Sequence, residues 1–531
     1  MISRGLLSKG ILSIIKRKNT GNLIPHVYYS EYHADIEERR KALGRLGISL
    51  YPSVTSDAST TTIPVIIEKW RNKITKSEIA MVRYTVCGRI SSIRYSGSKL
   101  AFFDVLYGNK KLQVVFNKKN IGTEEEMKGK FIPRLKALQK GDCIQCSGNV
   151  GRSGSGELSI YATELPKLLS PCLHPIPVKL TNYEKRFEKR FVDMMSNTKS
   201  LELLEKRYRI IESIRKFFSE RGFLEVETPI LSHHFGGATA RPFITSDIHK
   251  LPLTLRCAPE LWLKQLVIGG MNRVFELGKN FRNEGIDATH NPEFTSCEAY
   301  CAYLNLEGMK KLTEELIRFI CLTINGNLQI SGQTVDLEKG FEVIEFIPAL
   351  QKELNVELSP LDNSENCRKQ LISIFKRCEI MLPKTCTVAH LLDKLFDSLV
   401  LKYNTSSPKF VINHPEVMSP LAKSDIKLYG AVEQRISKRF ELYIGGYEIC
   451  NAYEEENDPV AQYHKFQAQK YDRLQLGDDE TPAPDSDFVH ALEYGLPPTA
   501  GWGMGVDRLV MLMTGQSKIS EILPFGSLRY V

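Results

Sequence analysis

The 531-residue sequence lacks an apolar run of about 18 residues, which a membrane-spanning helix needs, so no membrane insertion is predicted. It also lacks the bias of disordered, collagen-like or small disulfide-rich proteins, because 42% of its residues are hydrophobic and 25% are charged. The composition therefore indicates a globular protein. Its length predicts about two or three domains.

Acidic residues are missing from the start of the chain, where Glu31 is the first. Residues 1–24 contain five lysines and arginines, more than half of the net charge of +9. Four apolar residues there would share one helical face: Leu7, Ile11, Ile14 and Ile15. This pattern predicts a mitochondrial transit peptide at 1–24 and localisation in the mitochondrial matrix. A disordered basic tail is the alternative, whereas Lys9 interrupts the apolar core that a secretory signal would need.

Cysteine pairs with metal-binding spacing are scarce. Of twelve cysteines, Cys143 and Cys146 form a CxxC pair, and no second pair follows at zinc-finger spacing. Their surroundings, CIQCSGNV, are typical of a strand. We therefore predict packed free thiols in a reducing compartment and no zinc site.

Two common nucleotide-binding loops are also missing. The segment GWGMGVDRLVML (501–512) alternates glycines, but no GK[ST] follows as in a P-loop. No strand–helix–strand unit with a later acidic residue surrounds it, as a dinucleotide site would require. Alternating glycines on a strand would instead let another group approach the backbone closely. Arg508 then begins an apolar helical run.

The chain divides near a stretch with four prolines at 166–180, which we predict to be a linker. Before it, residues 31–52 predict a charged surface helix, and residues 79–178 contain five short alternating strands that predict a small OB-type barrel. After it, from Asn182 on, strands mix with helices predicted at 200–221, 307–324 and 388–402. A barrel of the oligonucleotide-binding type suggests a nucleic-acid substrate.

The most informative segment is 273–303, RVFELGKNFRNEGIDATHNPEFTSCEAYCAY. It predicts two strands joined by a polar loop, with Arg282 and Glu284 on one face of the first strand. Antiparallel pairing would gather seven side chains on one surface: Arg282, Glu284, His290, Phe294, Ser296, Glu298 and Tyr300. The alternative is a solvated sheet face with salt bridges, which would not need aromatic rings among the charges.

The segment 440–459, FELYIGGYEICNAYEEENDP, carries glutamates at seven-residue intervals: Glu441, Glu448 and Glu455. On a helix they would form one solvated stripe. The Gly445-Gly446 pair and the β-branched and aromatic content favour strands instead. A carboxylate cluster there could hold Mg²⁺ together with substrate phosphates.

Three segments in order resemble motifs 1, 2 and 3 of class II aminoacyl-tRNA synthetases: RGFLEVETPIL (221–231), FRNEG with HNPEF, and GMGVDR. Within that class, APELWLKQLVIGG (258–270), FRNEGIDATHNPEFTSCEAY and CNAYEEENDP resemble lysyl-tRNA synthetases of subclass IIb. The resemblance covers nearly everything from residue 31 onward. With the basic N-terminus, the chain looks like a mitochondrial form.

The resemblance implies an α+β fold. A class II catalytic domain at 182–531 would contain a six-stranded antiparallel sheet with flanking helices. An N-terminal helix and an all-β OB-fold anticodon-binding domain would precede it at 31–178. The motifs would lie at about 207–231, 273–303 and 501–513, and motif 1 implies a homodimer. The implied activity is ATP-dependent ligation of L-lysine to tRNA(Lys) through a lysyl-adenylate, for mitochondrial translation.

The resemblance also implies the ATP site. Arg282 would grip the α-phosphate and the amino-acid carboxylate, and Glu284 would accept from the adenine amino group. Phe294 would stack under adenine, and Arg508 would lie above it and reach the γ-phosphate. His290 would lie near the β- and γ-phosphates. Arg282 and Arg508 are thus the implied catalytic residues, acting by charge stabilisation.

Metal and lysine sites follow from the same resemblance. Glu441 and Glu448 would hold Mg²⁺, and Asn451 would help to hold the lysine carboxylate.

The side-chain ammonium of lysine would lie between Glu260 and Glu455, with the Tyr300 hydroxyl. Glu298 and the carbonyl of Gly236 would hold the α-amino group. A buried ammonium needs carboxylate partners, which makes physical sense of these residues.

In the barrel, the family positions that read the central anticodon uridine match Phe102, Gln113 and Glu157. Phe102 would stack on the base, and the polar pair would bond its edge. Since Phe103 must face the other way, one of the two phenylalanines is expected in the core, and Arg89 is a plausible neighbour of the base.

Two alternatives remain at this point. One is a synthetase for aspartate or asparagine, which shares the barrel and the motifs. An aspartate pocket would need cations where this sequence has Glu260 and Glu455. The other is a tRNA-binding paralogue without catalysis, which the presence of Arg282 and Arg508 disfavours.

Overall fold

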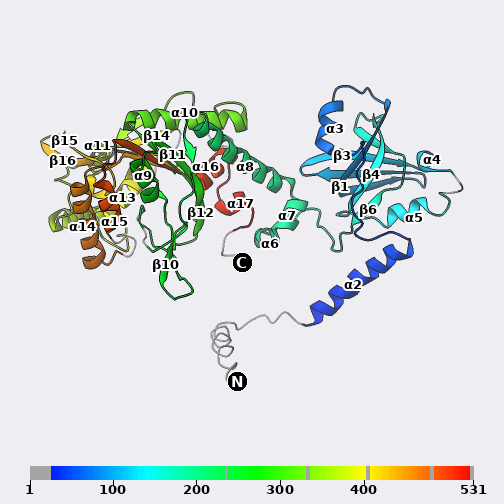
Figure 1. Ribbon diagram of the computed structural model, residues 1–531, viewed down its shortest axis with the longest axis horizontal. Helices are drawn as coiled ribbons and strands as arrows, with labels where there is room; N and C mark the ends of the chain where they lie inside the picture. Colours follow the sequence, from blue (N-terminus) through cyan, green and yellow to red (C-terminus); the bar gives the residue numbers. More distant parts are fainter. Residues whose placement is uncertain are drawn as a thin grey trace, which may run out of the picture. The chain divides into compact units, whose positions relative to one another are not determined.

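The computed structural model describes residues 26–123, 125, 127–233, 236–238, 240–330, 335–401, 407–478 and 484–526 (Figure 1). The predicted transit peptide at 1–24 lies outside these residues. The described chain forms two compact units. The first extends to Thr181 and includes Phe191–Leu201, and the second comprises the rest. No helix in the described ranges is long and apolar enough to cross a membrane.

The first unit contains a barrel of six strands: β1 (Ile79–Ser96), β2 (Leu100–Tyr107), β3 (Lys110–Asn117), β4 (Cys143–Arg152), β5 (Leu158–Ala162) and β6 (Lys167–Ser170). Their order is β1-β2-β3-β5-β4-β6, and a further pairing of β1 with β4 closes the barrel. This confirms the predicted OB-type barrel. The prediction of a linker from residue 166 was wrong at its start, because β6 pairs there with β4.

Closure depends on the length of β1. Its first half pairs with β4 and its second half with β2, and a register shift lies between Ile90 and Ser92. A bulge of this kind bends a strand and increases its twist, so one strand can serve both neighbours. Phe103 and Phe116 fill the interior, with ring centroids 4.9 Å apart.

Helices accompany the barrel: α2 (His26–Arg45), α3 (Ile63–Trp70), α4 (Lys118–Ile121) and α5 (Phe131–Lys136). The helix predicted at 31–52 is α2, which ends earlier than expected. Gly47 has a φ of 63°, a left-handed conformation that is common just after a helix end.

The second unit is built on an eight-stranded sheet. In spatial order its strands are β13 (Glu342–Glu345), β14 (Lys409–Ile412), β17 (Arg439–Ile444), β18 (Tyr447–Glu454), β19 (Thr499–Gly505), β12 (Glu293–Ala302), β11 (Arg273–Phe281) and β7 (Leu224–Glu225). The six inner strands pair antiparallel, as the resemblance implied. The structure adds β13 and β7, one at each edge, both paired parallel. The strands expected at 440–459 are β17 and β18.

Three helices close against the sheet in one hydrophobic core: α8 (Thr198–Ser219), α10 (Leu306–Asn325) and α16 (Val506–Thr514). Amphipathic patterns explain their packing, since apolar residues at helical spacing form one stripe. In α8, for example, Ile210, Ile214, Phe217 and Phe218 are all fully buried. Together with α13 (Val388–Leu399), these elements confirm the predicted helices within a few residues.

A second core combines α9 (Glu260–Ile268) and α15 (Ser486–Leu492) with Phe466 of α14 (Pro459–Gln475). A third contains α11 (Phe346–Leu354), α12 (Glu365–Arg377) and α13 (Val388–Leu399). The remaining elements are α6 (Tyr183–Glu188), α7 (Arg190–Ser196), β8 (Leu231–Ser232), β9 (Ile244–Ser246), β10 (Pro252–Leu255), η2 (Glu416–Met418), β15 (Ser424–Tyr429), β16 (Val432–Ser437) and α17 (Ile519–Ile522).

Candidate active site

A cavity of about 610 Å³ opens over the inner strands of the large sheet. Strands β11, β12, β17, β18 and β19 form its floor, and residues of α9, α13, α14 and η2 contribute to its walls. It brings together twelve of the predicted residues: Gly236, Glu260, Arg282, Glu284, His290, Phe294, Glu298, Tyr300, Glu441, Glu448, Asn451 and Arg508. Glu455 is not among the lining residues.

Arg282 occupies one end of the cavity, here named the phosphate end. The prediction that Arg282 and Glu284 share a strand face was wrong, because β11 ends at Phe281. The chain then turns tightly, and the Glu284 amide donates to the Arg282 carbonyl at 2.9 Å. Both side chains still line the cavity. The Arg282 guanidinium lies 5.1 Å from the centre of the Phe294 ring. Among the described residues, its buried Nε has no hydrogen-bond partner, so it can still bind an anion.

Arg508 and His290 meet at the same end. Arg508 Nη2 lies 2.9 Å from His290 Nε2, and His290 Nδ1 lies 2.8 Å from Asp287. Because arginine can only donate, Nε2 must accept, which puts the imidazole proton on Nδ1, facing Asp287. Arg508 Nη1 also donates to Glu448 at 3.3 Å. These contacts connect the motif 3 arginine with the motif 2 loop.

Glu441 and Glu448 lie on the adjacent strands β17 and β18. Glu441 is ion-paired with Arg439, accepts from Tyr443 Oη at 2.8 Å and lies 3.2 Å from His414 Nε2. Although burial opposes it, Arg439 and His414 lower the pKa of Glu441. Burial and the charge of Glu441 raise the pKa of Glu448. An added divalent cation would relieve this repulsion, so the pair fits Mg²⁺.

A second part of the cavity, here named the amino-acid end, contains buried carboxylates. Glu260 begins α9, and Glu298 and Tyr300 point from β12 into the cavity. The Tyr300 hydroxyl donates to Glu298 at 3.4 Å, and the Tyr453 hydroxyl donates to Glu260 at 3.3 Å. Burial, followed by the nearby charge of Glu260, raises the pKa of Glu298 to about 8. A bound cation would stabilise the ionised carboxylate.

Glu455 is fully buried behind this end, where its Oε2 pairs with Lys264. The structure explains why glycine is needed at 501, because an added Cβ would overlap Glu455 Oε1 and lie 2.7 Å from Tyr300 Cε1. This confirms the close approach predicted for the alternating glycines. At Gly503 the nearest atom would be at an ordinary 3.6 Å.

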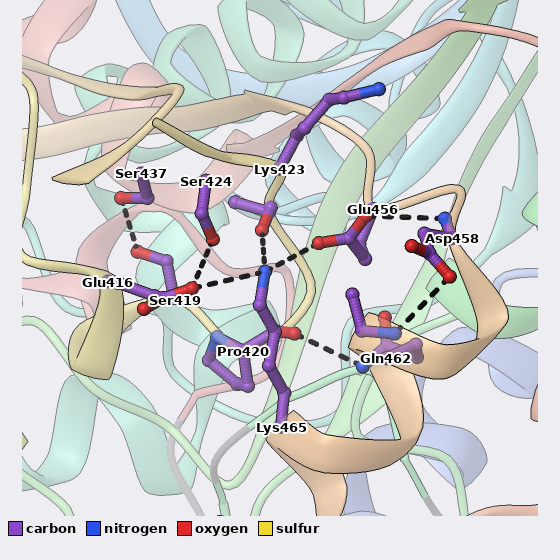
Figure 2. A network of polar contacts seen from close by, with 12 residues as sticks. Glu416, Ser419, Pro420, Lys423, Ser424, Ser437, Glu456, Asp458, Gln462 and Lys465 are labelled. Carbon is purple, nitrogen blue, oxygen red and sulfur yellow. Dashed lines mark hydrogen bonds and ion pairs between the residues drawn. The ribbon is translucent and has the colours of Figure 1, made fainter. Parts of the chain in front are cut away.

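The two acids that flank Glu455, Glu454 and Glu456, make contacts outside the cavity. Glu456 accepts from Lys465 of α14 at 2.7 Å, and Lys465 also donates to the Ala422 carbonyl at 2.6 Å (Figure 2). Glu454 accepts from the Leu306 amide at 3.1 Å. Figure 2 shows Lys465 in a network that also contains Glu416 and Ser424. The network therefore anchors the segment that carries Glu455.

The sequence reasoning missed several residues. Arg439 lines the cavity and donates from Nε to Asn451 Oδ1 at 3.0 Å, which leaves the Asn451 amide hydrogens free to face a carboxylate. Its place two residues before Glu441 on a strand was an available signal. Asp393 of α13 also lines the cavity, whereas the sequence predicted only a helix there and no site residue. Lys264 lies one helical turn from Glu260.

In the barrel, the structure decides between the two neighbouring phenylalanines. Phe103 is fully buried, and Phe102 is half-buried on the outer face. Gln113 shares that face, because it pairs with Asp104 two residues after Phe102. Gln113 Nε2 donates to Glu157 at 2.9 Å, so the predicted polar pair is in contact. Arg89, proposed as a neighbour, donates instead to the Gly141 carbonyl at 2.6 Å.

Comparisons with known proteins agree with this architecture. Residues 182–529 match the family described as tRNA synthetases class II (D, K and N), and residues 84–168 match the OB-fold nucleic acid binding domain. The chain is 42% identical to a probable cytoplasmic lysine–tRNA ligase of Encephalitozoon cuniculi, over 83% of this chain and 86% of that protein. It is 38% identical to the lysine–tRNA ligase of Enterococcus faecalis, over 86% of this chain and 89% of the relative. A lysine–tRNA ligase of Cladosporium cladosporioides is 36% identical, over 96% of this chain and 86% of the relative. The chain therefore belongs to the class II aminoacyl-tRNA synthetases, in the lysine–tRNA ligase family.

Proposed function

We propose that this chain ligates L-lysine to tRNA(Lys) in two steps. Lysine and ATP first form lysyl-adenylate and pyrophosphate. A hydroxyl of the terminal ribose of the tRNA then attacks the lysyl carbonyl, the bond to the phosphate breaks, and AMP leaves. The observation that carries the choice of lysine is the amino-acid end of the cavity. Glu260 of α9 faces it as a buried carboxylate whose Oε2 meets the Tyr453 hydroxyl, and a second buried carboxylate, Glu298, lies on β12. A cationic side chain fits there, and an aspartate side chain would be repelled.

In the first step, a lysine carboxylate oxygen attacks the α-phosphorus of ATP, and the bond to pyrophosphate breaks. The carboxylate is already ionised at neutral pH, so no protein base has to remove a proton. Arg282 would stabilise the charge that grows on the α-phosphate, for which its unpartnered Nε is available. Asn451, oriented by Arg439, would hold the lysine carboxylate for in-line attack.

Adenine would lie on Phe294, with Arg508 on its other side and Glu284 at its amino group. All three side chains line the cavity, which supports this arrangement. Glu441 and Glu448 would hold Mg²⁺, which when bound neutralises phosphate charge. His290 would contribute at the β- and γ-phosphates, next to its present partner Arg508.

We further propose that the outer face of the barrel binds the anticodon. Phe102 offers a ring for stacking, and the Gln113–Glu157 pair offers polar groups for a base edge. This division separates activation of the amino acid in one unit from selection of the tRNA in the other.

A homodimer is the assembly that we propose. Apolar side chains on and near motif 1 are exposed in the single chain: Leu224, Ile230, Leu231 and Ile244. A second copy would cover them, as the family's motif 1 implies. Light scattering on the purified chain should give twice the monomer mass, and a monomer at micromolar concentration would contradict the proposal.

We also propose that the enzyme acts in mitochondria, because residues 1–24 are basic, free of acids and amphipathic. A fusion of residues 1–30 to a fluorescent reporter should enter mitochondria. A diffuse cytosolic signal would reject the targeting role.

Amino-acid-dependent ATP–pyrophosphate exchange tests the central proposal. The chain without residues 1–24 would be assayed with each of the twenty amino acids. Exchange with lysine alone is expected. Exchange with aspartate or asparagine would retain the fold and refute the pocket assignment, and no exchange from the folded protein would favour a binding paralogue.

A further inference from the structure

A lysine of the protein itself lies inside the wall of the amino-acid end. Lys264 of α9 is completely buried, and its ammonium lies 2.7 Å from Glu260 Oε1 and pairs with Glu455 Oε2. Two aromatic rings complete its surroundings, with Nζ 5.6 Å from the centre of Phe488 and 6.0 Å from that of Tyr453. The site therefore resembles a binding pocket for an ammonium, already filled by the chain.

This arrangement divides the buried acids into two groups. Glu260 and Glu455 contact an ammonium of the protein before any substrate arrives, whereas Glu298 has no lysine or arginine within ion-pair distance among the described residues and feels only the more distant charges of Arg282 and Arg256. Lys264 uses Glu260 Oε1, so Glu260 Oε2, which meets the Tyr453 hydroxyl, is the oxygen left for a ligand. Without Lys264, three carboxylates would be buried together with no cation between them, at a large desolvation cost.

The contacts of Lys264 also connect separate elements. It reaches from the first turns of α9 to the segment just after β18, where the next residue, Glu456, is held by Lys465 (Figure 2). The positions of Glu260 and Glu455 are thus fixed relative to each other through one ammonium. Fixed carboxylates cost less reorganisation when a ligand binds than mobile ones do.

We infer that Lys264 is a positioning residue that sets the specificity of the amino-acid end: it holds Glu260 and Glu455 in place and leaves room and charge for one further ammonium. The inference rests on the proposed function, in which lysine is the amino acid bound there. A plain buried ion pair that serves only folding is the competing explanation. The two differ in what they predict for the KM of lysine.

The first test replaces Lys264 by Ala and measures pyrophosphate exchange. We expect the KM for lysine to rise at least tenfold while the KM for ATP changes less than twofold. A KM is independent of the fraction of folded enzyme, so poor folding of the variant does not hide the result. An unchanged KM for lysine, or equal rises for lysine and ATP, would overturn the inference.

Rescue by small molecules sharpens the test, because K264A leaves a space shaped for an alkylammonium. Propylammonium at millimolar concentration should lower the raised KM for lysine at least threefold, and 1-propanol of similar size should not. Equal rescue by the alcohol, or none by the amine, would mean that the ammonium has no specific role and would overturn the inference.

Lys409 provides the matched control. It lies on β14, has 4% of its surface exposed and pairs with Glu342 of β13 at 3.1 Å, outside the cavity lining. K409M should alter thermal stability without changing the KM for lysine. The wild-type chain in the same assay distinguishes failure of the proposed function from failure of the inference about Lys264. If the wild type does not activate lysine, the proposed function is refuted. If it does, and K264A has the same KM for lysine, only the role of Lys264 is refuted.

Discussion

The two ends of the active-site cavity differ in how the protein surrounds their charged groups. At the amino-acid end, Glu260, Lys264, Glu298 and Tyr300 project from a helix and a strand, and each is less than 10% exposed. At the phosphate end, Arg282 and His290 follow a strand in a loop, and His290 is exposed. The amino-acid end is buried, whereas part of the phosphate end is formed by an exposed loop.

This difference matches the two tasks that we propose for the cavity. Discrimination between amino acids requires charges in a dry site, where an unpaired ion is costly and a matched one is favoured. Binding of a triphosphate requires access for a large anion and groups that can adjust around it. We therefore expect changes at the phosphate end to abolish chemistry for every substrate, and changes at the amino-acid end to act mainly through lysine.

The largest effect is expected for Arg282→Ala. Loss of the group that stabilises charge at the α-phosphate should lower the rate of exchange by roughly 10³-fold. Arg282→Lys should recover part of this rate, since it keeps the charge without the planar fork. Steady-state exchange measures both variants, and near-normal activity of Arg282→Ala would remove Arg282 from the mechanism.

Glu298→Gln tests the amino-acid end. Its kcat/KM for lysine should fall by about 10²-fold, the order expected for a lost hydrogen bond to a charged group. The KM for ATP should stay close to that of the wild type. A comparable rise in the KM for ATP would show that the two ends are not separable.

The raised pKa of Glu298 predicts how the activity of the wild-type enzyme depends on pH. The pKa of Glu298 is raised to about 8, so the carboxyl is largely neutral below that pH and cannot pair with an ammonium. The kcat/KM for lysine should therefore rise with pH and level off above about pH 8. The pH dependence of kcat/KM for lysine is then measured for the Glu298→Gln variant with the same substrate. If the variant shows the same rise, the rise comes from a group other than Glu298.

Arg439→Met tests whether one residue supports both ends of the cavity. Arg439 contacts both Asn451 and Glu441, so its loss should disturb the amino-acid carboxylate and the metal pair together. We expect about a tenfold higher KM for lysine and a higher Mg²⁺ concentration for half-maximal exchange. Titration with Mg²⁺ at saturating lysine separates the two effects, and a change in only one would limit Arg439 to that end.

The smallest effect on activation is expected from the barrel. Phe102→Ala should leave exchange unchanged and lower kcat/KM for tRNA charging about tenfold, within the range for loss of one stacked base. Tyr107→Ala is the control, since Tyr107 is an exposed aromatic of the same strand whose place in the alternation puts it on the other face. Equal losses of exchange and charging for Phe102→Ala would indicate misfolding.

Much of the site could be predicted because it depends on local patterns. The alternation of Phe294, Ser296, Glu298 and Tyr300 places them on one face of any strand, and the structure brings all four into the cavity. The alternating glycines predicted a close approach, which Gly501 makes. Helical periodicity predicted α8, α10 and α13.

Contacts between distant segments could not be predicted in this way. The ion pair of Lys264 with Glu455 spans nearly two hundred residues, and no periodicity relates the two. Asp393 enters the cavity from α13 because of how the third core packs. The end of β11 at Phe281 was also missed, since the turn that follows depends on contacts such as that of the Asn283 amide with the Arg241 carbonyl, 2.7 Å apart.

By itself, the sequence predicted the OB-type barrel from strand periodicity, and its resemblance to class II synthetases implied the antiparallel sheet and the set of charged residues that line the cavity, because periodicity and motif order can be read from neighbouring residues. The tertiary structure alone decided how those charges are shared. In the tertiary structure Lys264 pairs with Glu260 and Glu455, and Glu298 has no ion pair among the described residues. The structure also decided that Phe103 rather than Phe102 lies in the core of the barrel. The physical reason is that pairing and desolvation depend on which segments meet in three dimensions.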